Sequence, residues 1–196
     1  MQIDVSSFHR LNVTDSCAAW NVLSSATLYD AATGAGCTFC CTQFVEYECI
    51  HKHRTKITAG DSALQDRFRL EAQRGRITVH QLDIADLQEV EILENRKRLS
   101  KGELSSIAFA KRTSQAFLTD DQKARKLART ALPNNRVQTT PHLMAWLYYA
   151  GVLTDGHTDA IVSEHRGHGR PLEPHLRAAH AEAIRCLAMR RMNQPR

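Results

Sequence analysis

Acidic side chains follow two apolar stretches that have the composition of short β-strands. Asp15 comes directly after residues 11–14, and Asp120 and Asp121 come after residues 116–119. In an open α/β sheet, ligands bind beyond the carboxyl ends of the strands, near the point where the strand order reverses. Carboxylates gathered there favour hard divalent cations such as Mg²⁺ or Mn²⁺. Such ions promote the attack of water on a phosphodiester, so the acids predict metal-dependent hydrolysis.

Each acid also has a simpler structural interpretation. Asp15 and Asp120 stand where a helix N-cap is expected, and Glu103 lies three residues after Ser100, which is the spacing of a capping box. A further acid precedes the basic residues 51–56, and the spacing does not decide between Glu46 and Glu48, because helix residues two apart point to different faces.

Strand-like and helix-like segments alternate along the chain, which predicts an α/β protein of three layers, α/β/α, with a central, mainly parallel sheet. We expect a helix from Ser16 to Tyr29 and a Gly-rich loop over residues 31–36. The other expected strands cover residues 37–42, 77–82, 116–119 and 136–140, and the other expected helices cover residues 44–50, 62–74, 84–94, 100–110, 122–132, 141–149 and 173–192.

The overall composition is that of a globular protein. The 196 residues are 42% hydrophobic and 24% charged, which suits one compact domain with a real core. The net charge of +5 suits an anionic partner such as nucleic acid. We expect a first segment over residues 1–155, with a His-rich loop and a helix over residues 156–196 packing on the same domain. The segment 165–170 is expected to be an exposed loop. No secretory signal or apolar span is recognisable, so we expect a soluble, cytoplasmic protein without membrane contact.

Several segments resemble the PIN-domain family. The most specific are Leu-Ser-Lys-Gly-Glu-Leu-Ser-Ser-Ile-Ala-Phe-Ala at 99–110 and Phe-Leu-Thr-Asp-Asp-Gln-Lys-Ala-Arg at 117–125. Val-Thr-Asp-Ser-Cys-Ala-Ala-Trp at 13–20 is similar to the family's first motif, and Val-Glu-Tyr-Glu at 45–48 to its second, which favours Glu48 over Glu46. The resemblance covers residues 11–153.

The resemblance implies a ribonuclease that hydrolyses RNA with Mg²⁺ or Mn²⁺. It implies that Asp15, Glu48, Glu103 and Asp121 are the catalytic, metal-binding acids, with Asp120 as an alternate or additional ligand. Thr119, before the last acids, stands where the family has a hydroxyl residue. Relatives of this kind serve in toxin–antitoxin or defence systems, so we expect an antitoxin or another protein as partner. A homodimer is compatible with this expectation. The alternative is an inactive PIN-like module that only binds RNA or protein.

Cysteine and histidine residues offer a second metal chemistry. Cys37 and Cys40 have the Cys-x-x-Cys spacing, and Cys41, Cys49, His51 and His53 follow closely. Thiolate and imidazole ligands suit Zn²⁺, but the first pair lies within an expected buried strand instead of a zinc knuckle. In a reducing compartment, these thiols are expected to fill the core.

Overall fold

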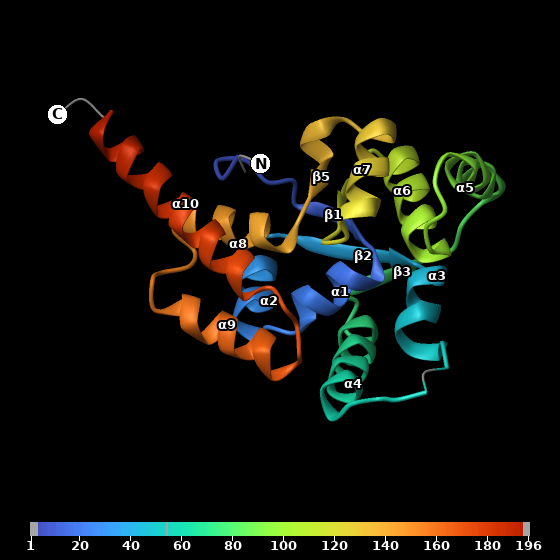
Figure 1. Ribbon diagram of the computed structural model, residues 1–196, viewed down its shortest axis with the longest axis horizontal. Coiled ribbons are helices and arrows are strands. Elements are labelled where there is room, and N and C mark those ends of the chain that lie inside the picture. The colour runs from blue at the N-terminus through green and yellow to red at the C-terminus, as the bar shows by residue number, and fades with distance from the viewer. Residues whose placement is uncertain (1–3, 54, 194–196) are drawn as a thin grey trace.

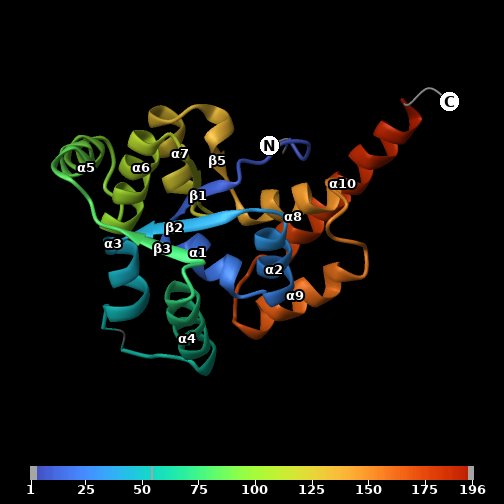
Figure 2. The same cartoon turned by 180° about the vertical axis from the view of Figure 1, so that it is seen from behind.

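The computed structural model, which describes residues 4–53 and 55–193, contains one central sheet of five parallel strands. The predicted ranges 1–155 and 156–196 include residues 1–3, 54 and 194–196, which lie outside the described residues. The strand order is β3-β2-β1-β4-β5. Figures 1 and 2 label β1, β2, β3 and β5. The strands are β1 Leu11–Thr14, β2 Thr38–Thr42, β3 Ile77–His80, β4 Ala116–Leu118 and β5 Val137–Gln138.

Helices cover both faces of the sheet, which confirms the predicted α/β/α layers (Figure 1). One apolar core lies between the sheet and α1, α2, α4 and α8 to α10, and the other lies between the sheet and α5 to α7. The helices are α1 Ser16–Leu23, α2 Ala26–Gly34, α3 Gln43–Glu46, the π-helix η1 Tyr47–His51, α4 Ala59–Gln73, α5 Ile84–Arg96, α6 Lys101–Thr113, α7 Gln122–Ala131, the 3₁₀-helix η2 Asn134–Arg136, α8 Thr140–Tyr149, α9 His157–Gly167 and α10 Glu173–Met192. Among the described residues, no helix is both long and apolar enough to cross a membrane.

The first predicted helix is divided in two. The expected helix from Ser16 to Tyr29 ends at Leu23, and a new helix starts at Ala26 and continues to Gly34, where we expected a loop. The reason is Ser25, whose extended backbone and side chain cap the second helix by accepting a hydrogen bond from the Leu28 N–H at 3.0 Å.

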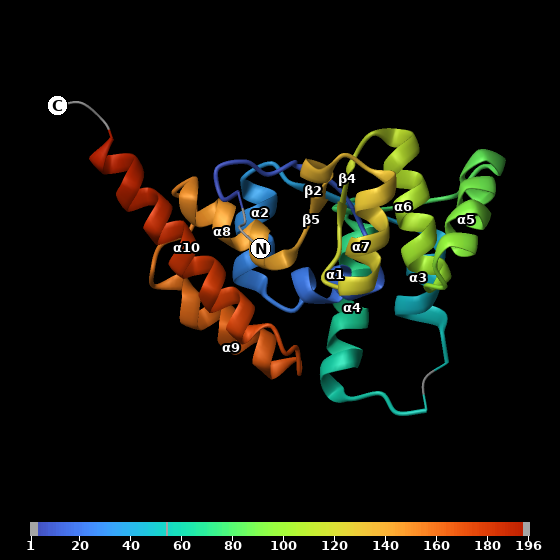
Figure 3. The same cartoon turned by 45° about the horizontal axis from the view of Figure 1, so that its top comes forward.

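The C-terminal region is more ordered than the predicted His-rich loop. Helix α9 includes His165 and Arg166, and the His165 side chain is fully buried, so the prediction of an exposed loop is wrong for His165 to Gly167, whereas residues 168–170 do form a turn after the helix. Ile161 and Val162 pack into the same core as Leu176 of α10, and α10 lies along α8 (Figure 3). The two helices therefore extend the core on the side of α2 and α8.

The strand order reverses between the two central strands. From β1 the chain continues to β2 and β3 on one side, and later returns to β4 and β5 on the other. Strands β1 and β4 pair directly, with Thr14 opposite Leu118 in the register. Asp15 and the Asp120–Asp121 pair therefore emerge side by side at the switch point, where α/β sheets bind ligands.

Candidate active site

Asp15 lies at the centre of the site and is completely buried. It is the N-cap of α1, because its Oδ1 accepts a hydrogen bond from the Ala18 N–H at 2.7 Å. Its other carboxylate oxygen accepts a hydrogen bond from the Thr119 hydroxyl. Asp15 thus performs the structural role that its position predicts, while its carboxylate also faces the end of β4.

The two acids after β4 have different surroundings. Asp121, not Asp120, is the N-cap of α7, and its Oδ1 accepts from the N–H groups of Lys123 and Ala124 at 2.6 and 2.7 Å. Asp120 instead accepts from the Asn21 amide at 2.8 Å and from the Thr140 hydroxyl at 2.6 Å. Asp120 is therefore fixed by α1 and by the start of α8, and its predicted role as a helix cap is wrong.

Glu48 reaches the site from the π-helical segment after β2. Its Oε1 accepts from the Gly102 N–H at 3.0 Å and its Oε2 accepts from the Ser16 hydroxyl at 2.8 Å, so the carboxylate lies between the first turns of α6 and α1. A Cβ at position 102 would stand 2.5 Å from Glu48 Oε2, so only glycine leaves room for the carboxylate. Glu46 makes no such contact with either helix start among the described residues.

Glu103 completes the capping box that the sequence predicts. The Ser100 hydroxyl accepts from the Glu103 N–H at 3.2 Å, and a carboxylate oxygen of Glu103 accepts from the Ser100 N–H at 2.8 Å. The charges of Asp121 and Glu48 also act on this carboxylate. Glu103 therefore caps α6 and belongs electrostatically to the acid group.

Burial and neighbouring charges raise the pKa of two of the acids, Asp15 and Glu103. Burial, followed by the charges of Asp120 and Glu103, raises the pKa of Asp15 to about 7, against the opposing hydrogen bonds from Ala18 and Thr119. Burial, with the charges of Asp121 and Glu48, also raises the pKa of Glu103. We call Asp15, Glu48, Glu103, Asp120 and Asp121 the acid cluster.

The acid cluster fits a hard divalent cation by its chemistry. Its donors are all carboxylate oxygens, and the repulsion between their charges favours a cation. Gly102 leaves space for the Glu48 carboxylate that a Cβ would fill. Over residues 4–53 and 55–193, no three or more His, Cys, Asp or Glu side chains are arranged to hold a metal ion as they stand. Ion binding therefore requires the carboxylates to turn from their present hydrogen bonds.

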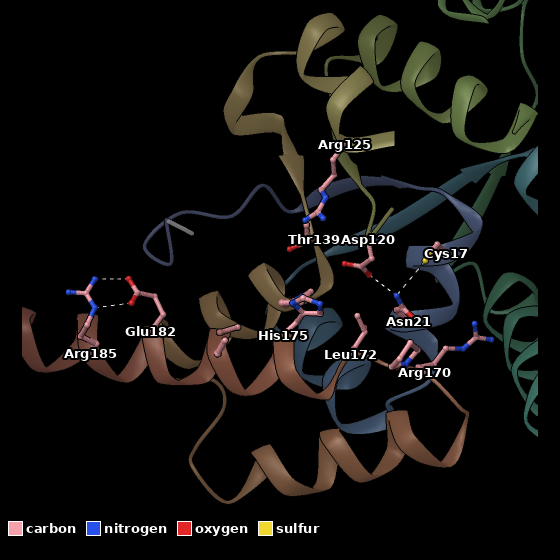
Figure 4. A pocket seen from close by; sticks show the side chains of 14 residues that line it. Cys17, Asn21, Asp120, Arg125, Thr139, Arg170, Leu172, His175, Glu182 and Arg185 are labelled. Carbon is pink, nitrogen blue, oxygen red and sulfur yellow. Dashed lines mark hydrogen bonds and ion pairs between the residues drawn. The ribbon is translucent and has the colours of Figure 1, made fainter. Parts of the chain in front are cut away.

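Two hollows lie beside the acid cluster. A groove of about 790 Å³ begins at Asp120 and Cys17 and extends to α10 (Figure 4). A second hollow of about 650 Å³ lies at Glu48 and is lined by the aromatic rings of Phe44 and Tyr47. The acid cluster therefore borders open space through Asp120 and through Glu48.

Sequence reasoning missed two residues that fix Asp120. Asn21 lies on α1 and Thr140 on α8, and together they donate the hydrogen bonds that orient this carboxylate. Asn21 is a buried polar residue on an otherwise apolar helix, which is the signal that could have drawn attention to it. For Thr140, the sequence contains no such signal, because a Thr before Pro at a helix start is common.

Cys37 and Cys40, the predicted Cys-x-x-Cys pair, do not come together as a zinc site requires. Cys37 belongs to the core shared with α1 and α2, whereas Cys40 belongs to the core on the other face, shared with α5 to α7. Burial raises the pKa of Cys37 to about 11 and that of Cys40 to about 12, which disfavours the thiolates that bind zinc. The pair serves as small apolar side chains in two separate cores.

Comparisons with known proteins agree with this architecture. Residues 42–138, which include Glu48, Glu103, Asp120 and Asp121, match the family described as the PIN domain. Comparisons with curated proteins and with solved structures gave no significant match. Taken with the parallel sheet and its switch point, the match shows that the chain belongs to the PIN-domain family. Members of this family are generally nucleases, and they typically use divalent metals.

Proposed function

We propose that this protein is an endoribonuclease that hydrolyses RNA phosphodiester bonds with Mg²⁺ or Mn²⁺ held by the acid cluster. The observation that carries the proposal is the position of these carboxylates, which follow or face the strands at the switch point. Burial, together with repulsion by the charges of Asp120 and Glu103, raises the pKa of the central Asp15 to about 7. A divalent cation is the natural way to relieve that repulsion.

The residues of the cluster have distinct tasks in this proposal. Asp15, Glu48, Glu103 and Asp121 would hold the metal, and Asp120 would be an additional ligand. When bound, the ion supplies positive charge that stabilises a phosphodiester under attack and makes water a better nucleophile. Thr119 orients Asp15 through its hydroxyl, and no covalent enzyme intermediate is expected.

Cleavage assays test the proposal directly. We expect the wild-type protein to cleave RNA in Mn²⁺ and to lose this activity in chelator and in the variants Asp15→Asn and Asp121→Asn. Asp30→Asn is the matched control, because Asp30 is an exposed aspartate on α2 that lies outside the cluster. Undiminished, chelator-resistant activity in the two cluster variants would rule out the metal mechanism.

One observation favours a non-catalytic binding module as the second candidate. Asp15, Glu103 and Asp121 all cap helices, so their presence has a sufficient structural reason without metal. This candidate predicts that RNA binds with the same affinity in Mn²⁺ and in chelator and that no cleavage occurs in either.

The biological setting that we propose is that of a toxin restrained by a protein partner. Exposed apolar residues on α10, namely Ile184, Met189 and Met192 at 39, 49 and 83% exposure, offer a surface that such a partner can cover. We expect induced expression of the wild type to arrest growth, and expression of Asp15→Asn at the same level to leave growth unaffected. A small DNA-binding protein encoded beside this gene would support the assignment, and equal growth in both cultures would contradict it.

A further inference from the structure

The groove beside Asp120 combines walls from distant parts of the chain. Figure 4 shows Arg125 extending from α7 toward Thr139, with Asp120 beside it and α10 forming the opposite wall. Leu172 and His175 belong to that opposite wall. Helices α9 and α10 lie outside the residues that match the PIN-domain family, so this wall is a feature of this chain's C-terminal region.

The groove carries positive charge on both of its sides. Arg125 lies on one side. On the other side Arg170, which forms an ion pair with Asp61 at 3.4 Å, precedes α10, and His175 adds an imidazole that can donate hydrogen bonds. Within the part of the chain that the structure describes, the Arg125 guanidinium has no hydrogen bond or ion pair, so it is available to a ligand. Arg185, farther along α10, is already engaged by Glu182 at 2.6 Å.

Apolar surface lies between these cations. Pro141, Pro171, Leu172 and Ala178 line the groove, and the buried Ala179 forms part of its wall. Cations that alternate with apolar surface suit a single strand of nucleic acid. Its phosphates can pair with arginine, and its bases can pack on apolar side chains. A volume of about 790 Å³ accommodates part of a single strand.

The groove is continuous with the acid cluster. Asp120 belongs to both, and Cys17, in the groove, lies within the electrostatic reach of Asp15, Asp120, Asp121 and Arg170. We propose that the groove binds a single strand of RNA that leads into the acid cluster, with Arg125 at a phosphate and the first half of α10 as its outer wall. This inference rests on the proposed function for the nature of the ligand.

Binding measured without cleavage tests the proposal. The probe is a fluorescently labelled single-stranded oligouridine, titrated with protein in chelator at several salt concentrations, with fluorescence anisotropy as the readout. We expect Arg125→Ala to weaken binding by about threefold to tenfold at low salt and to lower the slope of log affinity against log salt by about 0.7, as loss of one phosphate contact requires. Lys126→Ala removes an exposed charge from the same helix and should bind as the wild type does.

A second pair of variants examines the α10 wall. Ala178→Glu places a negative charge in the groove, whereas Ala188→Glu places the same charge on an exposed part of α10 away from it. We expect weaker RNA binding only for Ala178→Glu, with unchanged thermal unfolding in both. RNA affinity that is unchanged in Arg125→Ala and Ala178→Glu overturns the proposal and leaves the groove to a protein ligand.

These outcomes are separable from those of the proposed function. RNA binding that depends on the groove residues, without cleavage in Mn²⁺, would contradict the proposed hydrolysis and support the proposed RNA-binding groove. Mn²⁺-dependent cleavage with the same KM in the wild type, Arg125→Ala and Ala178→Glu would contradict the proposed RNA-binding groove and support the proposed hydrolysis.

Discussion

Replacing Asp15 with asparagine should stabilise the metal-free protein at alkaline pH. The Asp15 carboxyl titrates at its ordinary value of 3.8 in the unfolded chain and at about 7 in the folded protein, chiefly because it is buried. Between these values the folded state holds more protons, so the free energy of unfolding falls as the pH rises from about 4 to about 7 and then levels off. At 1.36 kcal/mol for each pKa unit, the ionised carboxylate costs about 4 kcal/mol above pH 7.

Asparagine removes this cost and keeps the helix cap. Its side-chain oxygen can still accept from the Ala18 N–H, and its amide can donate to the Thr119 hydroxyl. We therefore expect Asp15→Asn to be more stable than the wild type by about 2 to 4 kcal/mol at pH 8 and by almost nothing at pH 4.

Urea denaturation in chelator at several pH values measures this difference. The control Asp30→Asn, at an exposed position on α2, should show no such dependence on pH. Added Mn²⁺ should stabilise the wild type and leave Asp15→Asn unchanged, because the variant lacks the central ligand. Equal destabilisation of Asp15→Asn at pH 4 and pH 8 would refute the prediction that the ionised, buried Asp15 carboxylate destabilises the folded protein.

Three further substitutions test the surroundings of the site and the core. Gly102→Ala should displace the Glu48 carboxylate and reduce cleavage as far as Glu48→Gln does. The free energy of unfolding should change by less than about 1 kcal/mol, because the higher helix propensity of alanine offsets the lost hydrogen bond. Full cleavage activity in Gly102→Ala would contradict this prediction. Thr140→Val removes the 2.6 Å hydrogen bond to Asp120, and calorimetric titration should find weaker Mn²⁺ binding with a stability loss of about 1 kcal/mol; unchanged affinity would show that Asp120 is no ligand. Leu176→Ala should lower the unfolding free energy by about 2 to 5 kcal/mol in a single transition, because the fully buried Leu176 belongs to the main core; a separate early transition would show that α10 unfolds independently.

Local patterns predicted the frame of the site. Strand, acid and helix follow one another directly at Asp15, and the cap geometry there depends only on neighbouring residues. After β4 the same pattern predicted a cap but placed it at Asp120, one residue before the actual N-cap, Asp121. The capping box of Ser100 and Glu103 is local in the same way. The resulting sheet is parallel throughout, as the alternation of strands and helices predicted.

Contacts between distant segments were beyond such patterns. Glu48 is placed by Gly102, which is 54 residues away, and its preference over Glu46 came from the resemblance to PIN domains alone. The break at Ser25 was missed because its hydroxyl, besides capping α2, donates a hydrogen bond to Glu164 of the distant helix α9. The burial of His165 was missed because it depends on how α9 packs on the core. Helix α9 does contain a signal, since Ile161, Val162 and His165 follow helical spacing and all three side chains are buried.

The central claim is that the acid cluster holds divalent metal, and counting bound ions tests it most directly. Electron paramagnetic resonance of Mn²⁺ titrated into the protein near pH 7.5 distinguishes bound from free ion. We predict saturable binding of one or two Mn²⁺ per wild-type chain, absent in the double variant Asp15→Asn, Asp121→Asn and retained in Asp30→Asn. Equal Mn²⁺ binding by the double variant and the wild type, or none by the wild type at millimolar Mn²⁺, would contradict the claim.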